Sequence, residues 1–118
     1  MNIEQAAEAI VGQTILKVEL EADTIYIRTP AGTLSIMDDG QLCCEQRFIT
    51  TDDDLALKGG IVRELVLEPV VGVDSDESGV HAVAFLRLVT SLGVAVFCTH
   101  NIHNGCYEGF NVQAEWHA

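Results

Sequence analysis

The spacing of hydrophobic residues predicts one short helix at the start of the chain and strands after it. Apolar residues recur at helical spacing from Ile3 to Val11, and Asn2 is placed to cap the first turn. From Thr14 to Leu20 hydrophobic and polar residues alternate, which is typical of a strand with one buried face. Two short turns then predict a three-stranded antiparallel meander that leads to residues 42–49.

The second half of the chain is more apolar, and its pattern predicts central strands. Residues 80–89 and 94–98 are almost continuously hydrophobic, which favours strands covered on both faces. Two further strands are predicted at 61–68 and 110–116. Between the halves, Thr51 and the aspartates after it resemble the capped, acidic first turn of a second short helix, closed by Gly59 and Gly60.

Together these elements indicate an α+β fold, mainly antiparallel β, in a single domain over residues 1–118. With 48% hydrophobic residues, a chain of this length can bury a core. Two pairs of segments also resemble each other. Residues 9–20 match 57–68, with Gly12 opposite Gly60, and the stretch from Cys43 to Phe48 matches Cys106 to Phe110. We therefore expect an internal two-fold duplication.

The charge of the chain is strongly negative and unevenly spread. It has 18 carboxylates against 6 Lys and Arg, a formal net charge of -12, which argues against direct binding of nucleic acid. Such acidity can instead mimic a polyanion to a basic partner. All carboxylates but Glu108 and Glu115 precede Gly79. We therefore expect the neutral C-terminal half to be buried in the core or in a homo-oligomer.

The sequence gives no sign of a membrane or an export route. There is no apolar run of the length that a membrane span needs, and the N-terminus lacks the basic start of a signal peptide. We expect a cytoplasmic protein, in the host cytoplasm if a phage encodes it. Its four cysteines are then expected to be reduced.

Two acidic runs are the candidates for contact with a protein partner. The candidate residues are Asp52, Asp53, Asp54, Asp74, Asp76 and Glu77. The second run begins like a calcium-binding loop, but the position that needs a glutamate holds Phe85, so a solvated hairpin loop is the better interpretation. The three consecutive aspartates are too few ligands for a cation. We expect no metal or other cofactor at either run.

The segment from Cys98 to Cys106 leaves two interpretations open. Cys98, His100, His103 and Cys106 would suit a soft metal ion, helped by Cys43 or His117, and would then support a metal-dependent enzyme. We expect instead a polar hairpin loop that turns at Asn104 and Gly105, since one tight loop seldom completes a tetrahedral site.

A second alternative function is the sequestering of a small molecule such as a nucleotide signal. Its pocket, between subunits, would be lined by Phe97, His100, Asn101 and Tyr107. The shortage of cations to hold a phosphate stands against this alternative.

Residues 42–49 contain adjacent cysteines, Cys43 and Cys44, followed by Glu45. In a strand, neighbouring side chains point to opposite faces, so the two sulfurs cannot hold one ion or close an unstrained disulfide. We expect Cys44 to be a small buried residue and Glu45 to pair with Arg47 on the other face. No phosphate loop, hydrolase elbow or zinc-protease motif occurs, so we expect no enzyme activity.

The order of these motifs resembles a family of small uncharacterised proteins common in bacteriophages and prophages. The resemblance runs from about Val11 to Trp116, and its marks are Cys43-Cys44-Glu45 and the Asn104-Gly105 loop before Tyr107. It implies a fold and a genetic setting, without a known chemistry. The expected function is a non-catalytic acidic binding protein, an inhibitor of a host defence nuclease or complex of the anti-CRISPR kind.

Overall fold

The computed structural model describes residues 1–40, 45–68, 72–76, 79–103 and 109–118. Its elements are α1 (Ile3–Ile10), β1 (Lys17–Glu21), β2 (Thr24–Thr29), β3 (Gly32–Asp38), β4 (Gln46–Thr51), β5 (Val62–Leu67), β6 (Gly72–Asp76), β7 (Gly79–Thr90), β8 (Gly93–His103) and β9 (Val112–His117). The α+β, mainly antiparallel fold predicted from the sequence is confirmed. In the described residues, no helix has the length and apolarity that spanning a membrane requires.

Helix α1 begins where its sequence predicts. The Asn2 side chain accepts a hydrogen bond from the Gln5 backbone, and the Gln5 side chain accepts one from the Asn2 backbone, a reciprocal capping box. The helix buries Ile3, Ala6 and Ile10 against β5 and β9. Since eight residues are too few for a helix that is stable alone, this packing is what holds it.

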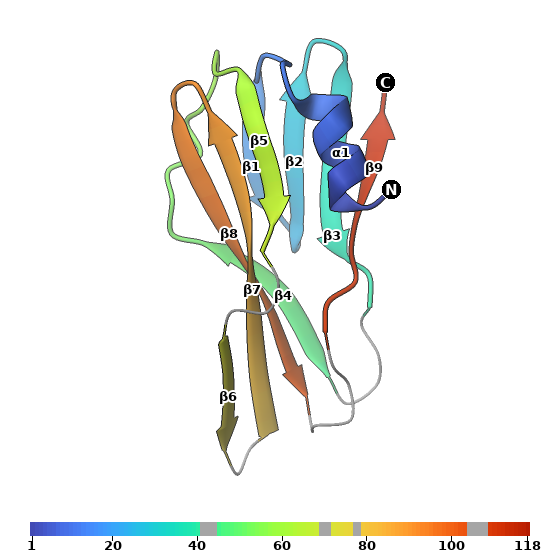
Figure 1. Ribbon diagram of the computed structural model, residues 1–118, viewed down its shortest axis with the longest axis vertical. Helices are drawn as coiled ribbons and strands as arrows, with labels where there is room; N and C mark the ends of the chain where they lie inside the picture. Colours follow the sequence, from blue (N-terminus) through green and yellow to red (C-terminus); the bar gives the residue numbers. More distant parts are fainter. Residues whose placement is uncertain (41–44, 69–71, 77–78, 104–108) are drawn as a thin grey trace.

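The strands form two antiparallel sheets that enclose one core (Figure 1). Sheet one has the order β1-β2-β3-β9, and sheet two has the order β4-β8-β7-β5. The short β6 pairs with the far half of β7, beyond the end of β5. In Figure 1 this far half of sheet two extends below the sandwich, and the molecule is 46 Å long but only 24 Å and 22 Å across.

The two sheets repeat one arrangement, as the predicted duplication requires. β1, β2 and β3 are ordered like β5, β7 and β8, and each hairpin turns through a Thr-x-x-Gly sequence. The Thr29 hydroxyl donates to the carbonyl of Gly32 (3.0 Å), and the Thr90 hydroxyl donates to that of Gly93 (2.8 Å). The strand after each hairpin crosses over: β4 joins β8, and β9 joins β3.

The repeat differs by one residue from the predicted alignment. The Gly12 amide donates to the Val62 carbonyl and the Gly59 amide to the Ile15 carbonyl, each at 2.8 Å. Both glycines have a φ of 89°. The residue equivalent to Gly12 is therefore Gly59, and not Gly60, because only the former repeats the positive φ that favours glycine.

The predicted second helix is wrong. Residues 52–60 form a loop in which one aspartate side chain bonds to a backbone amide of the loop and another to an amide of β8. Asp53 accepts from the Val96 amide (2.6 Å), and Asp54 accepts from the Ala56 amide (3.0 Å). Such side-chain bonds compete with helix formation, which explains why the acidic run does not open a helix.

Strands β7 and β8 are longer than predicted and are not covered on both faces. β8 continues to His103, so the segment predicted as a polar loop is strand over its described part. Along both strands, buried side chains alternate with half-buried ones. One face packs on the core, and the other is partly open in the single protomer. Burial of this face in a homo-oligomer stays a prediction.

Candidate functional site

The partly open face of sheet two is the first candidate site. Side chains that are cross-strand partners share a face, so the registers of β4, β8, β7 and β6 define its members. We call it the outer face. The described residues on it that matter here are Phe48, Thr50, Asp74, His81, Val83, Phe85, Val96, Cys98 and His100.

A hydrogen-bonded chain of three side chains crosses the outer face from β4 over β8 to β7. His100 Nδ1 is 2.9 Å from His81 Nε2, and His100 Nε2 is 2.8 Å from the Thr50 hydroxyl oxygen. The Phe48 ring stacks on the His100 ring, with centroids 4.3 Å apart and planes 7° apart. Burial lowers the pKa of His100, and the neighbouring His81 lowers it further. His100 is therefore neutral at neutral pH.

A cavity of about 210 Å³ opens beside Thr50. It is lined by Thr50, Thr51, Asp52, Asp53, Phe85, Val96 and Cys98. Its walls are thus apolar on the β7 and β8 side and acidic on the side of the loop after β4. A small uncharged group fits this combination better than an anion does.

Cys98 lies in the wall of this cavity, and its thiol is expected to react slowly. Burial raises the pKa of Cys98, and the charge of Asp52 raises it further. A raised pKa leaves less thiolate at a given pH, so iodoacetamide should alkylate Cys98 at pH 8 more slowly than it alkylates free cysteine. Asp52→Asn should speed the reaction. Mass spectrometry of a variant with serine at Cys43, Cys44 and Cys106 measures the rate, and alkylation as fast as that of free cysteine would contradict this expectation.

Carboxylates flank the outer face at two margins. Asp52, Asp53 and Asp54 are exposed at one margin, and Asp74 is exposed at the other, directly across from His81. None of these four has an ion pair in the described part of the chain. Of the other two predicted partner-binding residues, Asp76 ends β6 and Glu77 lies outside the described residues.

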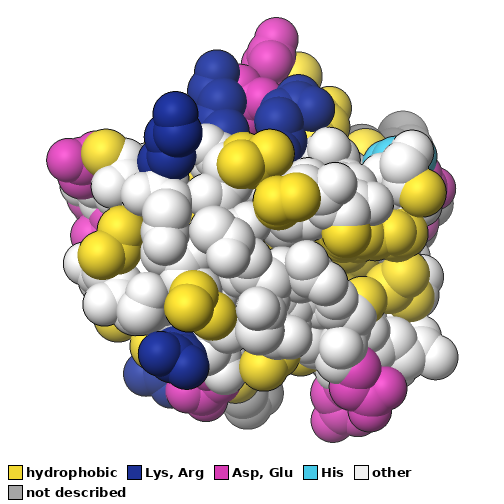
Figure 2. Space-filling view, turned by 90° about the horizontal axis from the view of Figure 1, so that it is seen from above, with side chains coloured by type: hydrophobic (Ala, Val, Ile, Leu, Met, Phe, Trp, Pro, Cys, Tyr) yellow, Lys and Arg dark blue, Asp and Glu magenta, His cyan; other side chains and the backbone are white. Residues whose placement is uncertain are grey.

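Most exposed cations lie away from this face. Figure 2 shows the end of the molecule that carries the β2–β3 and β7–β8 turns, where Lys and Arg gather at the edges. The exposed cations in the described residues are Lys17, Arg28, Lys58 and Arg63. Arg87 is on the outer face but pairs with Glu68 at 3.2 Å. The outer face therefore has no unpaired Lys or Arg among the described residues.

The opposite, inner face of the same strands holds a buried charge cluster. The Arg47 guanidinium donates to both Glu45 oxygens (3.0 and 3.2 Å), to both Asp38 oxygens (2.9 and 3.1 Å) and to the Gly109 carbonyl (3.3 Å). The side chains of Arg47, Asp38 and Glu45 are 7%, 3% and 0% exposed. The Glu45–Arg47 pair predicted from the sequence is present. It lies on the buried side of β4, and Asp38 joins it from β3.

Polar residues of β8 continue this inner face. Thr99, Asn101 and His103 are buried, and the Asn101 amide donates to the Gly109 carbonyl at 3.1 Å. Among the described residues, the Thr99 hydroxyl and the Asn101 amide oxygen have no hydrogen-bond partner. Buried polar groups of this kind commonly bond to ordered water in folded proteins.

The structure does not bring together the two residue sets predicted on β8. Phe97 is 1% exposed in the core and Asn101 faces inward, whereas His100 faces outward, so these three residues cannot line one pocket. Cys98 and His100 likewise face away from His103. In the part of the chain that the structure describes, no group of three His, Cys, Asp or Glu could hold a metal ion. Cys43, Cys44, Cys106 and Tyr107 lie outside the described residues.

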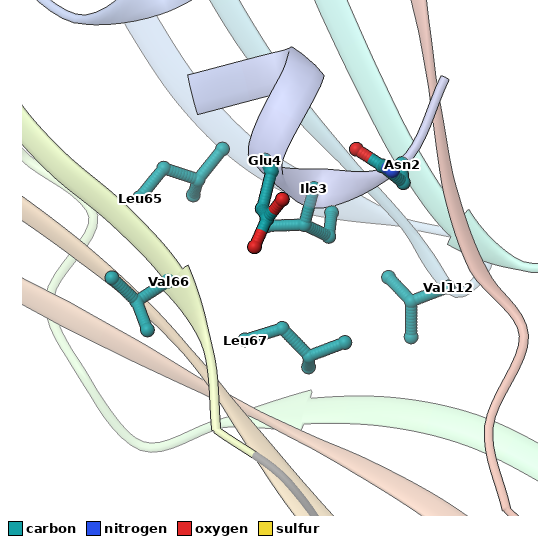
Figure 3. Close-up of a pocket in the computed structure, with 7 residues that line it drawn as sticks. All are labelled: Asn2, Ile3, Glu4, Leu65, Val66, Leu67 and Val112. Carbon is teal, nitrogen blue, oxygen red and sulfur yellow. The ribbon is translucent and has the colours of Figure 1, made fainter. Parts of the chain in front are cut away.

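A wider groove of about 550 Å³ lies between α1, β5 and β9 (Figure 3). It is lined by Asn2, Ile3, Glu4, Leu65, Val66, Leu67 and Val112. Among the described residues of this lining Glu4 is the only charged side chain, and the Asn2 side chain is engaged in the helix cap. Since binding sites combine an apolar lining with several convergent polar groups, this groove is the weaker candidate.

No protein-family model, curated protein or solved structure matches the chain. The resemblance to the phage family therefore stays a prediction. Sequence reasoning named His100 and the acidic runs but missed the contact of Thr50 and His81 with His100. No motif signals it, because the three residues are far apart in sequence and meet only through strand register.

Proposed function

We propose that this is a binding protein whose outer face contacts a basic protein. The observation that carries the proposal is a partly exposed sheet face with an apolar centre and with carboxylates at its margins that form no ion pair among the described residues. Protein interfaces combine an apolar centre with a polar or charged rim in this way. The partner is expected to present basic residues to Asp52, Asp53, Asp54 and Asp74.

The charges and the apolar centre contribute differently to such binding. Burial of Val83, Phe85 and Val96 would supply most of the free energy, at about 25 cal/mol per Å² of apolar surface. The carboxylates would speed association and select a basic partner. Proteins that bind nucleic acid present such basic surfaces, so we propose a partner of this class. In the setting that the phage resemblance implies, the partner is a nuclease or complex of host defence.

The acidic margin is tested with substitutions that remove charge and keep the loop. A partner is captured from a nuclease-treated bacterial lysate and purified, and its Kd is measured by calorimetry. Asn in place of Asp52, Asp53 and Asp54 retains the oxygens that accept from the Val96 and Ala56 amides. We expect a Kd about tenfold higher at low salt, a difference that shrinks as salt is added.

A matched control variant shows whether the weaker binding comes from the acidic margin or from the change in net charge. Gln in place of Glu4, Glu8 and Glu115, exposed on α1 and β9, removes the same number of charges. This control should bind like the unmodified protein, and equal loss in both variants would overturn the proposal.

The apolar centre is tested with an introduced cation. Val83→Lys should abolish binding, whereas Met37→Lys, at an exposed position on sheet one, should not. The same variant tests self-association. If a second copy covers the outer face, light scattering will show Val83→Lys as a monomer and the unmodified chain as a larger species.

A further inference from the structure

We propose that Thr50, His100 and His81 form a nucleophilic relay in which the Thr50 hydroxyl attacks small acyl esters. The three side chains come from β4, β8 and β7, the adjacent strands of sheet two. Their two contacts are 2.8 and 2.9 Å long and run from hydroxyl to imidazole to imidazole. This is the order of nucleophile, base and orienting group that activates a hydroxyl in acyl transfer.

The hydrogen-bond roles in the chain are consistent with this order. When His81 is neutral with its proton on Nδ1, its Nε2 accepts from the Nδ1–H of His100. The Nε2 atom of His100 is then a free acceptor for the Thr50 hydroxyl proton. One tautomer of each ring thus satisfies both contacts and leaves the base facing the nucleophile.

The surroundings hold His100 in place and keep it neutral. Phe48 stacks on one side of its ring, which restricts the rotation that would break either contact. Burial disfavours the charged form of His100. A base that is unprotonated at neutral pH can accept a proton when it is needed.

The cavity beside Thr50 defines the class of substrate. Thr50 is exposed and lines the 210 Å³ space together with Phe85 and Val96, which offer an apolar wall for a short acyl group. Asp52 and Asp53 line the same space and disfavour anionic esters. The expected substrates are therefore uncharged or cationic esters of small acids.

The reaction balances without a cofactor. The Thr50 oxygen bonds to the ester carbonyl carbon as its proton moves to His100 Nε2, and the resulting imidazolium donates to His81. The carbon–oxygen bond to the alcohol then breaks, and His100 returns the proton to the leaving alcohol. Water, deprotonated by His100, attacks the acyl carbon, the bond to the Thr50 oxygen breaks, and His100 returns the proton to that oxygen. The net change is ester and water to acid and alcohol.

The test uses p-nitrophenyl acetate with the full chain. We expect release of nitrophenolate and an acetyl group on the tryptic peptide Phe48–Lys58, which fragmentation assigns to Thr50. Thr51 is an internal control in the same peptide, because its hydroxyl donates to the Val96 carbonyl at 2.8 Å and, among the described residues, does not contact a histidine. Acetylation of Thr51 as readily as of Thr50 would overturn the proposal.

Variants test whether the three side chains take part in acetylation or only stabilise the structure. Thr50→Val should lose the adduct, and Thr50→Ser should keep it or form it faster, because a primary hydroxyl is less hindered. His100→Gln and His81→Gln should each slow acetylation, His100→Gln by about 100-fold, the scale of general-base catalysis. Thr33→Val, on β3 of sheet one and outside the cavity lining, should change nothing. A persistent rate in Thr50→Val, or an unchanged rate in His100→Gln, would refute the relay.

The relay does not depend on the proposed partner. The ester reaches the cavity in the free protein, so acetylation of Thr50 without binding of any basic protein would count against the proposed function alone. Tight binding of a basic protein with no acetylation would count against the relay alone.

Discussion

Replacing Arg47 with alanine is expected to lower the free energy of unfolding by about 3–5 kcal/mol. Arg47 is the shared partner of Asp38 and Glu45, and all three side chains are almost fully buried. Removing the guanidinium takes away the positive charge that both buried carboxylates contact. Urea denaturation at pH 7 measures the loss, with the same m-value expected if the fold is kept.

Two control variants test whether the loss of stability comes from burial of the charges. Arg28→Ala removes an exposed pair with Glu19, and its effect should be much smaller, because water solvates the remaining carboxylate. The triple variant with Met at Arg47, Asn at Asp38 and Gln at Glu45 removes all the charges together and should recover part of the loss. If Arg47→Ala destabilises no more than Arg28→Ala, the cluster is not buried as described.

The second large effect is expected at the hairpin glycines, where the internal repeat supplies a matched pair. Gly32 and Gly93 have the same φ of 157° in equivalent Thr-x-x-Gly turns. A Cβ at position 32 would lie 2.5 Å from the His117 carbonyl oxygen and 2.9 Å from the Trp116 ring. At position 93 the nearest atom is a Leu57 methyl group, 3.7 Å away.

Alanine should therefore cost more at Gly32 than at Gly93. Both variants share the backbone strain of a conformation that favours glycine, about 1–3 kcal/mol. Gly32→Ala adds the overpacking against β9, about 1–3 kcal/mol more. Chemical denaturation of the two variants measures the difference. Equal stabilities would mean that β9 does not close on the first hairpin as it does in the structure.

The local pattern of the chain determined most elements. Helical spacing located α1 to within one residue, and alternation located β1, β5 and β9 to within three. The repeat also left a trace in the sequence: Cys43 and Cys106 have the same spacing as two equivalent positions, Thr51 opposite Phe97 on β8 and Ala114 opposite Ile36 on β3. Burial of one face of a helix or strand leaves this periodicity in any sequence, so it can be recognised without tertiary structure.

The burial of charged residues on one face of β4 could not be predicted from the local sequence pattern. Alternation correctly placed Glu45 and Arg47 on the same side, but their charges suggested the solvent side. The reason they lie inside is Asp38, which completes the pairing from another strand. A charge is buried only when a distant partner compensates it, and that partner is not visible from the local sequence.

The candidate site was decided by tertiary structure alone. The exchange of β4 and β9 between the sheets sets which residues become neighbours, and a shift of one residue in the β4–β8 register would separate Thr50 from His100. The sequence by itself determined the strands, their acidic margins and the neutral character of the second half. Which side chains meet depends on registers between distant segments, which the packing of the whole core selects.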